Sequence, residues 1–133
     1  MFLTSDQLLL HLLGDYLLQS DWMAMNKTKS HLAALVHALT YSVPFLLLSP
    51  SWIGWILILS THELIDRYRL ARYVVWAKNF LGPRGANQPW KECSSTGYPA
   101  ESAERPAWLT VWLLIIADNI IHLLINGVAL KYL

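Results

Sequence analysis

Charged side chains are scarce in this sequence, and cysteine is almost absent. Only 14% of the 133 residues are Asp, Glu, Lys or Arg, whereas 55% are hydrophobic. Soluble domains carry about 25% charged residues, so the composition argues against an ordinary soluble protein. The lone Cys93, in a polar stretch, excludes an intrachain disulfide and is interpreted as a loop thiol. Ten basic against nine acidic residues give no charge excess for nucleic-acid binding, so no nucleic-acid partner is expected.

The sequence contains several long apolar runs. Four segments of this kind occupy residues 3–19, 31–48, 51–66 and 107–130. A bilayer core of about 30 Å needs about 20 helical residues, so the fourth run spans comfortably while the first and third are short. No cleavable signal peptide is expected, because the first run lacks a basic start and contains Asp6, His11 and Asp15. The sequence predicts an all-α fold, with residues 1–133 forming one integral membrane domain built as a four-helix transmembrane bundle.

Basic residues predict how these helices are oriented. They gather in the first and third connections, whereas the turn at 49–51 has no charge. Cytoplasmic loops attract Lys and Arg, so we expect cytoplasmic loops at about 20–30 and 67–106, with both termini outside a multi-pass inner (cytoplasmic) membrane protein. The alternation of arginines with apolar residues over 67–81 predicts that the third helix continues as an interfacial helix along the inner surface.

Polar residues recur inside the apolar runs as three His–Asp pairs, each four residues apart. This spacing places both side chains of a pair on one helix face. An aspartate at the centre of a membrane helix costs about 2.5–3.5 kcal/mol, so three of them need a compensating interaction. Counted from the cytoplasmic ends, the pairs and one further histidine reach overlapping depths. The predicted metal ligands are His11, Asp15, His37, His62, Asp66, Asp118 and His122.

Mixed imidazole and carboxylate donors suit a divalent transition metal, namely Zn, Mn or Fe. Seven donors exceed what one tetrahedral ion uses, and would suit two ions about 3.5–4 Å apart, as in many phosphoesterases. A hydrogen-bonded Asp/His core or a proton path is the alternative that the spacing leaves open.

Other polar residues near these faces are candidates for supporting roles. Glu63 follows His62 in a run similar to the zinc-protease helix and is the candidate catalytic residue, although it could instead pair with Arg67. Basic residues at the inner headgroup level could hold a lipid phosphate or serve only as positive-inside charges; they are Lys27, Arg67 and Arg69. The residues expected to bind and orient the cofactor ligands are Gln19, Tyr41 and Asn119.

Three stretches of the chain resemble a known family. They are His-Leu-Leu-Gly-Asp-Tyr-Leu-Leu-Gln-Ser-Asp-Trp at 11–22, His-Glu-Leu-Ile-Asp-Arg-Tyr-Arg-Leu-Ala-Arg-Tyr at 62–73, and Thr-Gly-Tyr-Pro with the following apolar run at 96–123. Together they resemble small bacterial and phage integral membrane proteins grouped as a domain of unknown function. The resemblance implies a helical membrane protein with motif positions at His11, Asp15, Gln19, His62, Asp66, Asp118, Asn119 and His122. More distantly, the arrangement is similar to membrane-bound metal-dependent hydrolases.

Two functions are compatible with these features. The first is a metal-dependent hydrolase that acts at the cytoplasmic leaflet on an amphiphilic substrate, with a phosphorylated, lipid-like molecule as one candidate. The second is a small non-enzymatic membrane protein of phage or bacterial origin that conducts ions or protons or binds a host membrane partner. Membrane lipid is an expected partner in both, and a homo-oligomer is an expected assembly.

Overall fold

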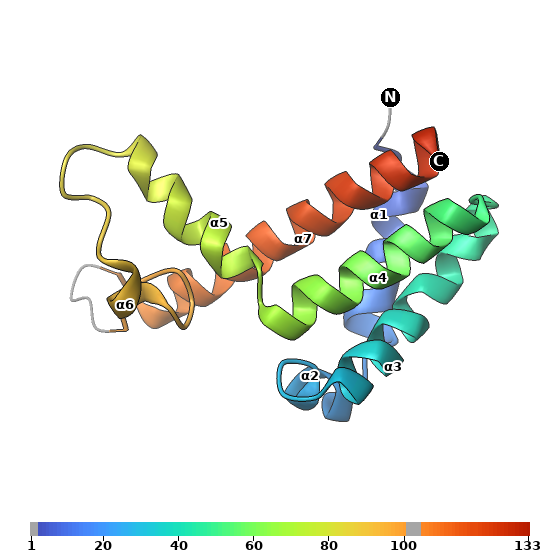
Figure 1. Cartoon of the computed structure of the whole chain (residues 1–133), viewed down its shortest axis with the longest axis horizontal. Helices are drawn as coiled ribbons and strands as arrows, with labels where there is room; N and C mark the ends of the chain where they lie inside the picture. Colours follow the sequence, from blue (N-terminus) through green and yellow to red (C-terminus); the bar gives the residue numbers. More distant parts are fainter. Residues whose placement is uncertain (1–2, 101–104) are drawn as a thin grey trace. The chain divides into compact units, whose positions relative to one another are not determined.

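The computed structural model describes residues 3–100 and 105–133, and all regular secondary structure in these ranges is helical (Figure 1). The predicted all-α fold is therefore confirmed. The chain divides into two compact units, the first comprising Met1–Arg69 with His122–Leu133 and the second comprising Leu70–Ile121. Each unit is described by itself. Positions 101–104 of the predicted cytoplasmic loop lie outside the described residues.

The helices follow the predicted apolar segments, with short helices added between them. The α-helices are α1 (Ser5–Leu12), α2 (Asp21–Asn26), α3 (His31–Ser42), α4 (Trp52–Tyr68), α5 (Ala71–Ala77), α6 (Trp90–Cys93) and α7 (Ala107–Tyr132). A π-helix, η1 (Leu13–Leu17), and two 3-10 helices, η2 (Val43–Leu48) and η3 (Lys78–Leu81), extend three of them.

The first unit is organised around the antiparallel pair of α3 and α4. The expected turn between them is present at Ser49, which adopts a left-handed conformation (φ 51°), and Ser51 caps α4 by accepting from the amide of Gly54. The indole of Trp55 donates to the carbonyl of Ser42 at 3.0 Å and ties the two helices together. The buried apolar core of this unit consists of Leu10, Tyr41, Phe45, Ile58 and Ala129.

The first apolar run is not one regular α-helix. After α1 the chain forms the π-helical turn η1, in which the amide of Leu18 donates to the carbonyl of Leu13, five residues earlier. Gly14 lets this turn approach α3 closely, since a Cβ built there would lie 2.5 Å from Cδ2 of Tyr41. The glycine thereby places Asp15 beside α3, where the functional residues gather.

Backbone chemistry explains two departures from the predicted helices. Pro44 has no amide donor, so the second run changes from α3 to the tighter η2 in this region. The prediction that the third helix continues through residues 67–81 is wrong, because Arg69 is left-handed (φ 51°) and ends α4. A separate helix, α5, then begins at Ala71.

The second unit carries a cluster of aromatic and basic side chains on α5 and the segment that follows it. The ring of Tyr73 stacks on Trp90 at a centroid distance of 4.6 Å, and the guanidinium of Arg72 lies over Tyr73. Cys93, predicted as a thiol in a polar loop, instead lies in α6 and is 1% exposed. Burial and the neighbouring Glu92 carboxylate raise the pKa of its thiol, which makes it a poor target for labelling reagents.

Two helical stretches have the length and hydropathy of membrane spans. They are His31–Leu48, formed by α3 and η2, and Ala107–Tyr132, which is α7. Many large apolar side chains also lie on the surface, including Leu17, Leu47 and Trp52, each at least 75% exposed. Membrane insertion would remove this apolar surface from water.

Candidate metal centre

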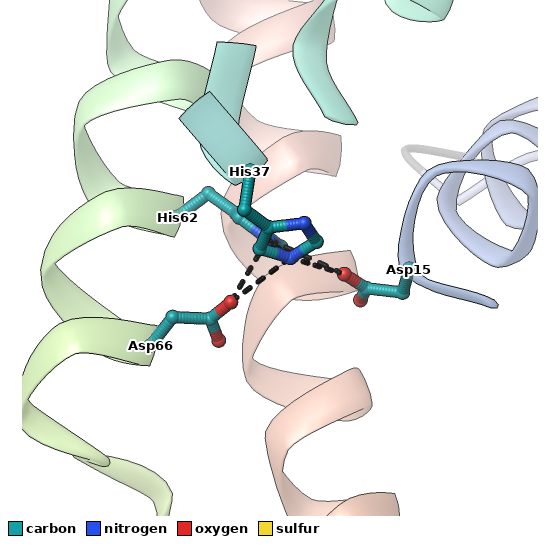
Figure 2. A group of neighbouring side chains, drawn as sticks. All are labelled: Asp15, His37, His62 and Asp66. Carbon is teal, nitrogen blue, oxygen red and sulfur yellow. Dashed lines mark hydrogen bonds and ion pairs between the residues drawn. The ribbon is translucent and has the colours of Figure 1, made fainter. Parts of the chain in front are cut away.

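Four buried side chains from three segments of the first unit converge on one point. Asp15 comes from η1, His37 from α3, and His62 and Asp66 from successive turns of α4. Figure 2 shows the two imidazoles between the two carboxylates. None of the four residues is more than 7% exposed. The four are among the predicted metal ligands, and together they can hold a metal ion.

The facing atoms of these side chains are almost equally spaced. Nε2 of His37 and Nε2 of His62 are 3.0 Å apart. Asp15 Oδ1 lies 3.2 Å from the first of these nitrogens and 3.3 Å from the second. Asp66 Oδ2 lies 3.1 and 3.3 Å from the same two nitrogens. Five of the six separations in this group of four atoms therefore fall between 3.0 and 3.3 Å.

These five separations are close to the ligand–ligand distances of a tetrahedral metal site. If four N and O ligands surround Zn²⁺ at about 2.0–2.1 Å, neighbouring ligand atoms are about 3.3–3.4 Å apart. The observed separations fall at most a few tenths of an ångström short of these edges. Small side-chain movements would therefore admit an ion at the centre.

Hydrogen bonding accounts for the same arrangement less well. A neutral imidazole carries one N–H, so if one Nε2 donates to the other at 3.0 Å, the accepting ring has no Nε2–H left for either carboxylate. Oδ1 of Asp15 is within ion-pair distance of both rings but receives no well-aligned hydrogen bond. The Nδ1 atoms of His37 and His62 are also buried without a hydrogen-bond partner. A cation bound among the four inward-facing atoms would pair the carboxylate oxygens and both Nε2 atoms, although it would not pair the Nδ1 atoms.

A second layer of polar residues supports the four donors, with Tyr41 at its centre. Its ring stacks on that of His62 with centroids 3.6 Å apart and an interplanar angle of 13°. The amide of Asn126 donates to the Tyr41 hydroxyl at 2.6 Å, and Nδ1 of His11 lies 2.8 Å from the same oxygen. His11 also lies 3.5 Å from Oδ2 of Asp15. Tyr41 thus packs directly on the ring of His62, and its role in orienting a metal ligand stays a prediction.

The structure places His122 beside the centre as well. Its Nε2 is 3.4 Å from Oδ1 of Asp66, the oxygen other than the one that faces His37 and His62. Its ring lies 4.1 Å from that of His62, centroid to centroid. His11 and His122 therefore each contact a carboxylate of the four-donor group through its outer oxygen. Their roles as metal ligands stay predictions.

The remaining predicted residues have other local contacts. Gln19 donates to the backbone carbonyl of Asp15 at 3.1 Å, next to the centre. The carboxylate of Glu63 forms an ion pair with Nδ1 of His31 at 2.9 Å. Asp118 and Asn119 lie in the part of α7 that belongs to the second unit, and Asn119 donates to the carbonyl of Ile115. Catalytic and ligand roles for these residues remain predictions.

Sequence reasoning missed two residues at the centre. The sequence places Lys27 at the inner headgroup level, as a lipid-phosphate ligand or a positive-inside charge, and does not predict that its Nζ lies 2.8 Å from Oδ2 of Asp66. Asn126 was not singled out, although it is a polar residue four positions after His122 in an apolar helix and is 1% exposed. The spacing of four could have revealed Asn126. Only the folded loop shows where Lys27 reaches.

Comparison with known proteins adds a family but no activity. A family described as a protein of unknown function (DUF3307) matches residues 3–88. The chain belongs to the DUF3307 family. The matched region includes all four donors and ends before α6 and α7. No curated protein and no solved structure matches the chain.

Proposed function

We propose that this DUF3307 protein is a membrane-embedded metal-dependent hydrolase that acts on an amphiphilic, phosphorylated substrate at the cytoplasmic leaflet. The observation that carries the metal centre is the convergence of Asp15 Oδ1, His37 Nε2, His62 Nε2 and Asp66 Oδ2, in which each carboxylate oxygen lies 3.1–3.3 Å from both nitrogens. Two imidazoles and two carboxylates suit Zn, Mn or Fe. These four donors suffice for one ion. A second ion, which would need further donors such as Asp118, stays a prediction.

Hydrolysis needs an activated water, and a bound divalent ion supplies one. The ion lowers the pKa of a coordinated water to near 7, and zinc with four ligands can accept a fifth. Asp15, His37, His62 and Asp66 would hold the ion, and the ion would supply an activated water for hydrolysis. In the overall reaction the phosphoryl group would pass from the leaving alcohol to water, and the alcohol oxygen would take up a proton. A catalytic role for Glu63, which pairs with His31 at 2.9 Å, stays a prediction.

The placement in a membrane rests on two observations. Two helices are apolar enough to cross a bilayer, and large apolar side chains cover much of the surface. We propose that α1 with η1 and α4 complete a four-span bundle, with both termini outside and α5 along the inner surface. The Lys and Arg residues of the 20–30 and 67–106 connections support this orientation.

Ion transport is the second candidate function. The four protein donors can complete a tetrahedron by themselves, as in a site that binds a metal ion without requiring a substrate. Zinc uptake by liposomes containing the protein, abolished in His37→Ala, would favour transport. Hydrolysis of a phosphorylated amphiphile by zinc-loaded protein, without uptake, would favour the enzyme.

Metal content is the direct test of the centre. Protein purified in mild detergent without chelator is expected to contain at least one equivalent of Zn, Mn or Fe by elemental analysis. Chelation should lower the melting temperature, because a ligand that binds only the folded state at 100 times its Kd adds about 2.7 kcal/mol of stability. A metal content near zero, with no thermal shift on adding Zn²⁺, Mn²⁺ or Fe²⁺, would contradict the proposal.

Thiol labelling tests the orientation. Cys93 is buried, so it is first replaced by Ala, and exposed Ser49 or Ser95 is then changed to Cys. In intact cells, an impermeant maleimide is expected to label Cys introduced at position 49 and to leave that at position 95 unmodified until the cells are lysed. The reverse pattern would mean that the chain is inserted the other way round.

A further inference from the structure

The ammonium group of Lys27 contacts two of the four inward-facing ligand atoms. Its Nζ lies 2.8 Å from Oδ2 of Asp66 and 3.4 Å from Nε2 of His37. The side chain is one fifth exposed, whereas that of Asp66 is 3% exposed. Lys27 therefore extends from the solvent-accessible side of this unit to the buried centre.

The backbone holds Lys27 in this position. Lys27 is the C-cap of α2, and its amide donates to the carbonyl of Met23 at 2.8 Å. The next residue, Thr28, accepts a hydrogen bond at its carbonyl from Nη1 of Arg67, also at 2.8 Å. Arg67 follows Asp66 directly in α4, so the loop that carries Lys27 is tied to the helix that carries two of the donors.

The position of Lys27 creates an electrostatic conflict once a metal ion is present. An ion bonded to Asp66 Oδ2 at about 2.0–2.2 Å would lie within about 5 Å of the ammonium. The charges of Asp15 and Asp66 neutralise a divalent ion, so Lys27 adds one uncompensated positive charge. An anion bound between the ion and the ammonium would compensate this positive charge, because it would be attracted to both cations.

We propose that Lys27 is the anion-recognition residue of this centre. Without metal, its ammonium takes the place of a cation at Asp66. With metal bound, it moves away from Asp66 and donates to an oxyanion whose other oxygen bonds the ion. The ligand class is a phosphate group, either free or as a monoester lipid headgroup. This inference rests on the proposed metal-dependent function and assigns the charged end of its substrate.

Zinc titrations with and without phosphate test the role of Lys27. Zinc affinity is measured by chelator competition on the full chain in detergent, for the wild type, Lys27→Met, Lys27→Arg and Lys29→Met. Lys29 is exposed in the same loop, so its variant removes the same charge as a control. Circular dichroism and thermal melting verify that each variant is folded.

Removal of Lys27 should strengthen zinc binding and abolish its coupling to phosphate. In phosphate-free buffer, Lys27→Met is expected to bind zinc about tenfold more tightly than the wild type, because the competing ammonium is gone. Saturating inorganic phosphate should tighten zinc binding about tenfold in the wild type and in Lys27→Arg, but less than about twofold in Lys27→Met. Lys29→Met should behave as the wild type in both titrations.

The source of the phosphate group is decided by comparing additives. Micelles containing phosphatidic acid should reproduce the coupling if the site takes a lipid headgroup, and phosphatidylcholine serves as the control. Coupling with inorganic phosphate alone would assign a soluble ligand.

Two results would overturn the assignment, and they are distinguishable. Zinc binding with equal affinity and equal phosphate response in the wild type and Lys27→Met would remove the role of Lys27 and leave the metal centre intact. Failure of every variant to bind zinc would remove the metal centre as well.

Discussion

Replacing Asp66 with Asn is expected to lower zinc affinity about 100- to 1,000-fold, since one of four protein ligands supplies roughly a quarter of a binding free energy on the order of 10–16 kcal/mol. The amide keeps the shape of the carboxylate but loses its charge. Asp15→Asn should have an effect of similar size, because Oδ1 of Asp15 has the same relation to both imidazoles. Isothermal titration of folded, detergent-solubilised variants measures the change.

The controls separate a ligand from a hydrogen-bond partner. Asp21→Asn changes an exposed carboxylate in the first turn of α2 and should leave zinc affinity unchanged. If Asp15 and Asp66 only hydrogen-bond the histidines, Asn can keep one such bond, and the variants would retain any bound metal. Full metal occupancy in both variants would show that the centre described here is wrong. Asp118→Asn tests for a second ion. If the wild-type chain binds two metal ions, this variant should still bind one equivalent.

Gly14→Ala is expected to destabilise the fold and to weaken zinc binding together. The added Cβ would lie 2.5 Å from Cδ2 of Tyr41 and 3.2 Å from its Cα, so η1 or α3 must shift. Overpacking of this kind costs about 1–3 kcal/mol, although an Ala in an open helical position would stabilise by up to about 1 kcal/mol. Because Asp15 is the next residue, the shift also moves one of the four donors. Thermal melting and zinc titration report the two effects.

Gly54→Ala is the matched control. Gly54 is also helical and also lacks space, since a Cβ there would lie 2.9 Å from the carbonyl oxygen of Ala129. It precedes His62 by two turns of α4, so its replacement should lower the melting temperature with a much smaller change in zinc affinity. If Gly14→Ala raised the melting temperature and left zinc affinity unchanged, the close contact between η1 and Tyr41 would not exist in the protein.

Helix periodicity allowed much of the centre to be predicted. His62 and Asp66 are four residues apart in a regular helix, and their facing atoms are 3.3 Å apart. His37 has no paired aspartate in its own segment, but it lies in an apolar run and its predicted depth matches that of the three pairs. These features depend on helix geometry and apolar length, which the sequence encodes locally.

Features that depend on tertiary contacts were not predictable in the same way. The π-helical turn at Leu13–Leu17 breaks the regular period and depends on the close approach of Gly14 to Tyr41. The left-handed conformation of Arg69 separates α4 from α5, although non-glycine residues seldom adopt it. Lys27 lies in a loop, and only the bond from Arg67 to Thr28 shows why its ammonium reaches Asp66.

All four donors precede residue 67, which has a consequence for biosynthesis. When Asp66 has been added to the chain, residues 67–133 are still to be made. At about 5–20 residues per second, this takes the ribosome roughly 3–13 s. The first three apolar segments can therefore meet while α7 is still untranslated. His122 and Asn126 would then pack against a group of four donors that is already assembled.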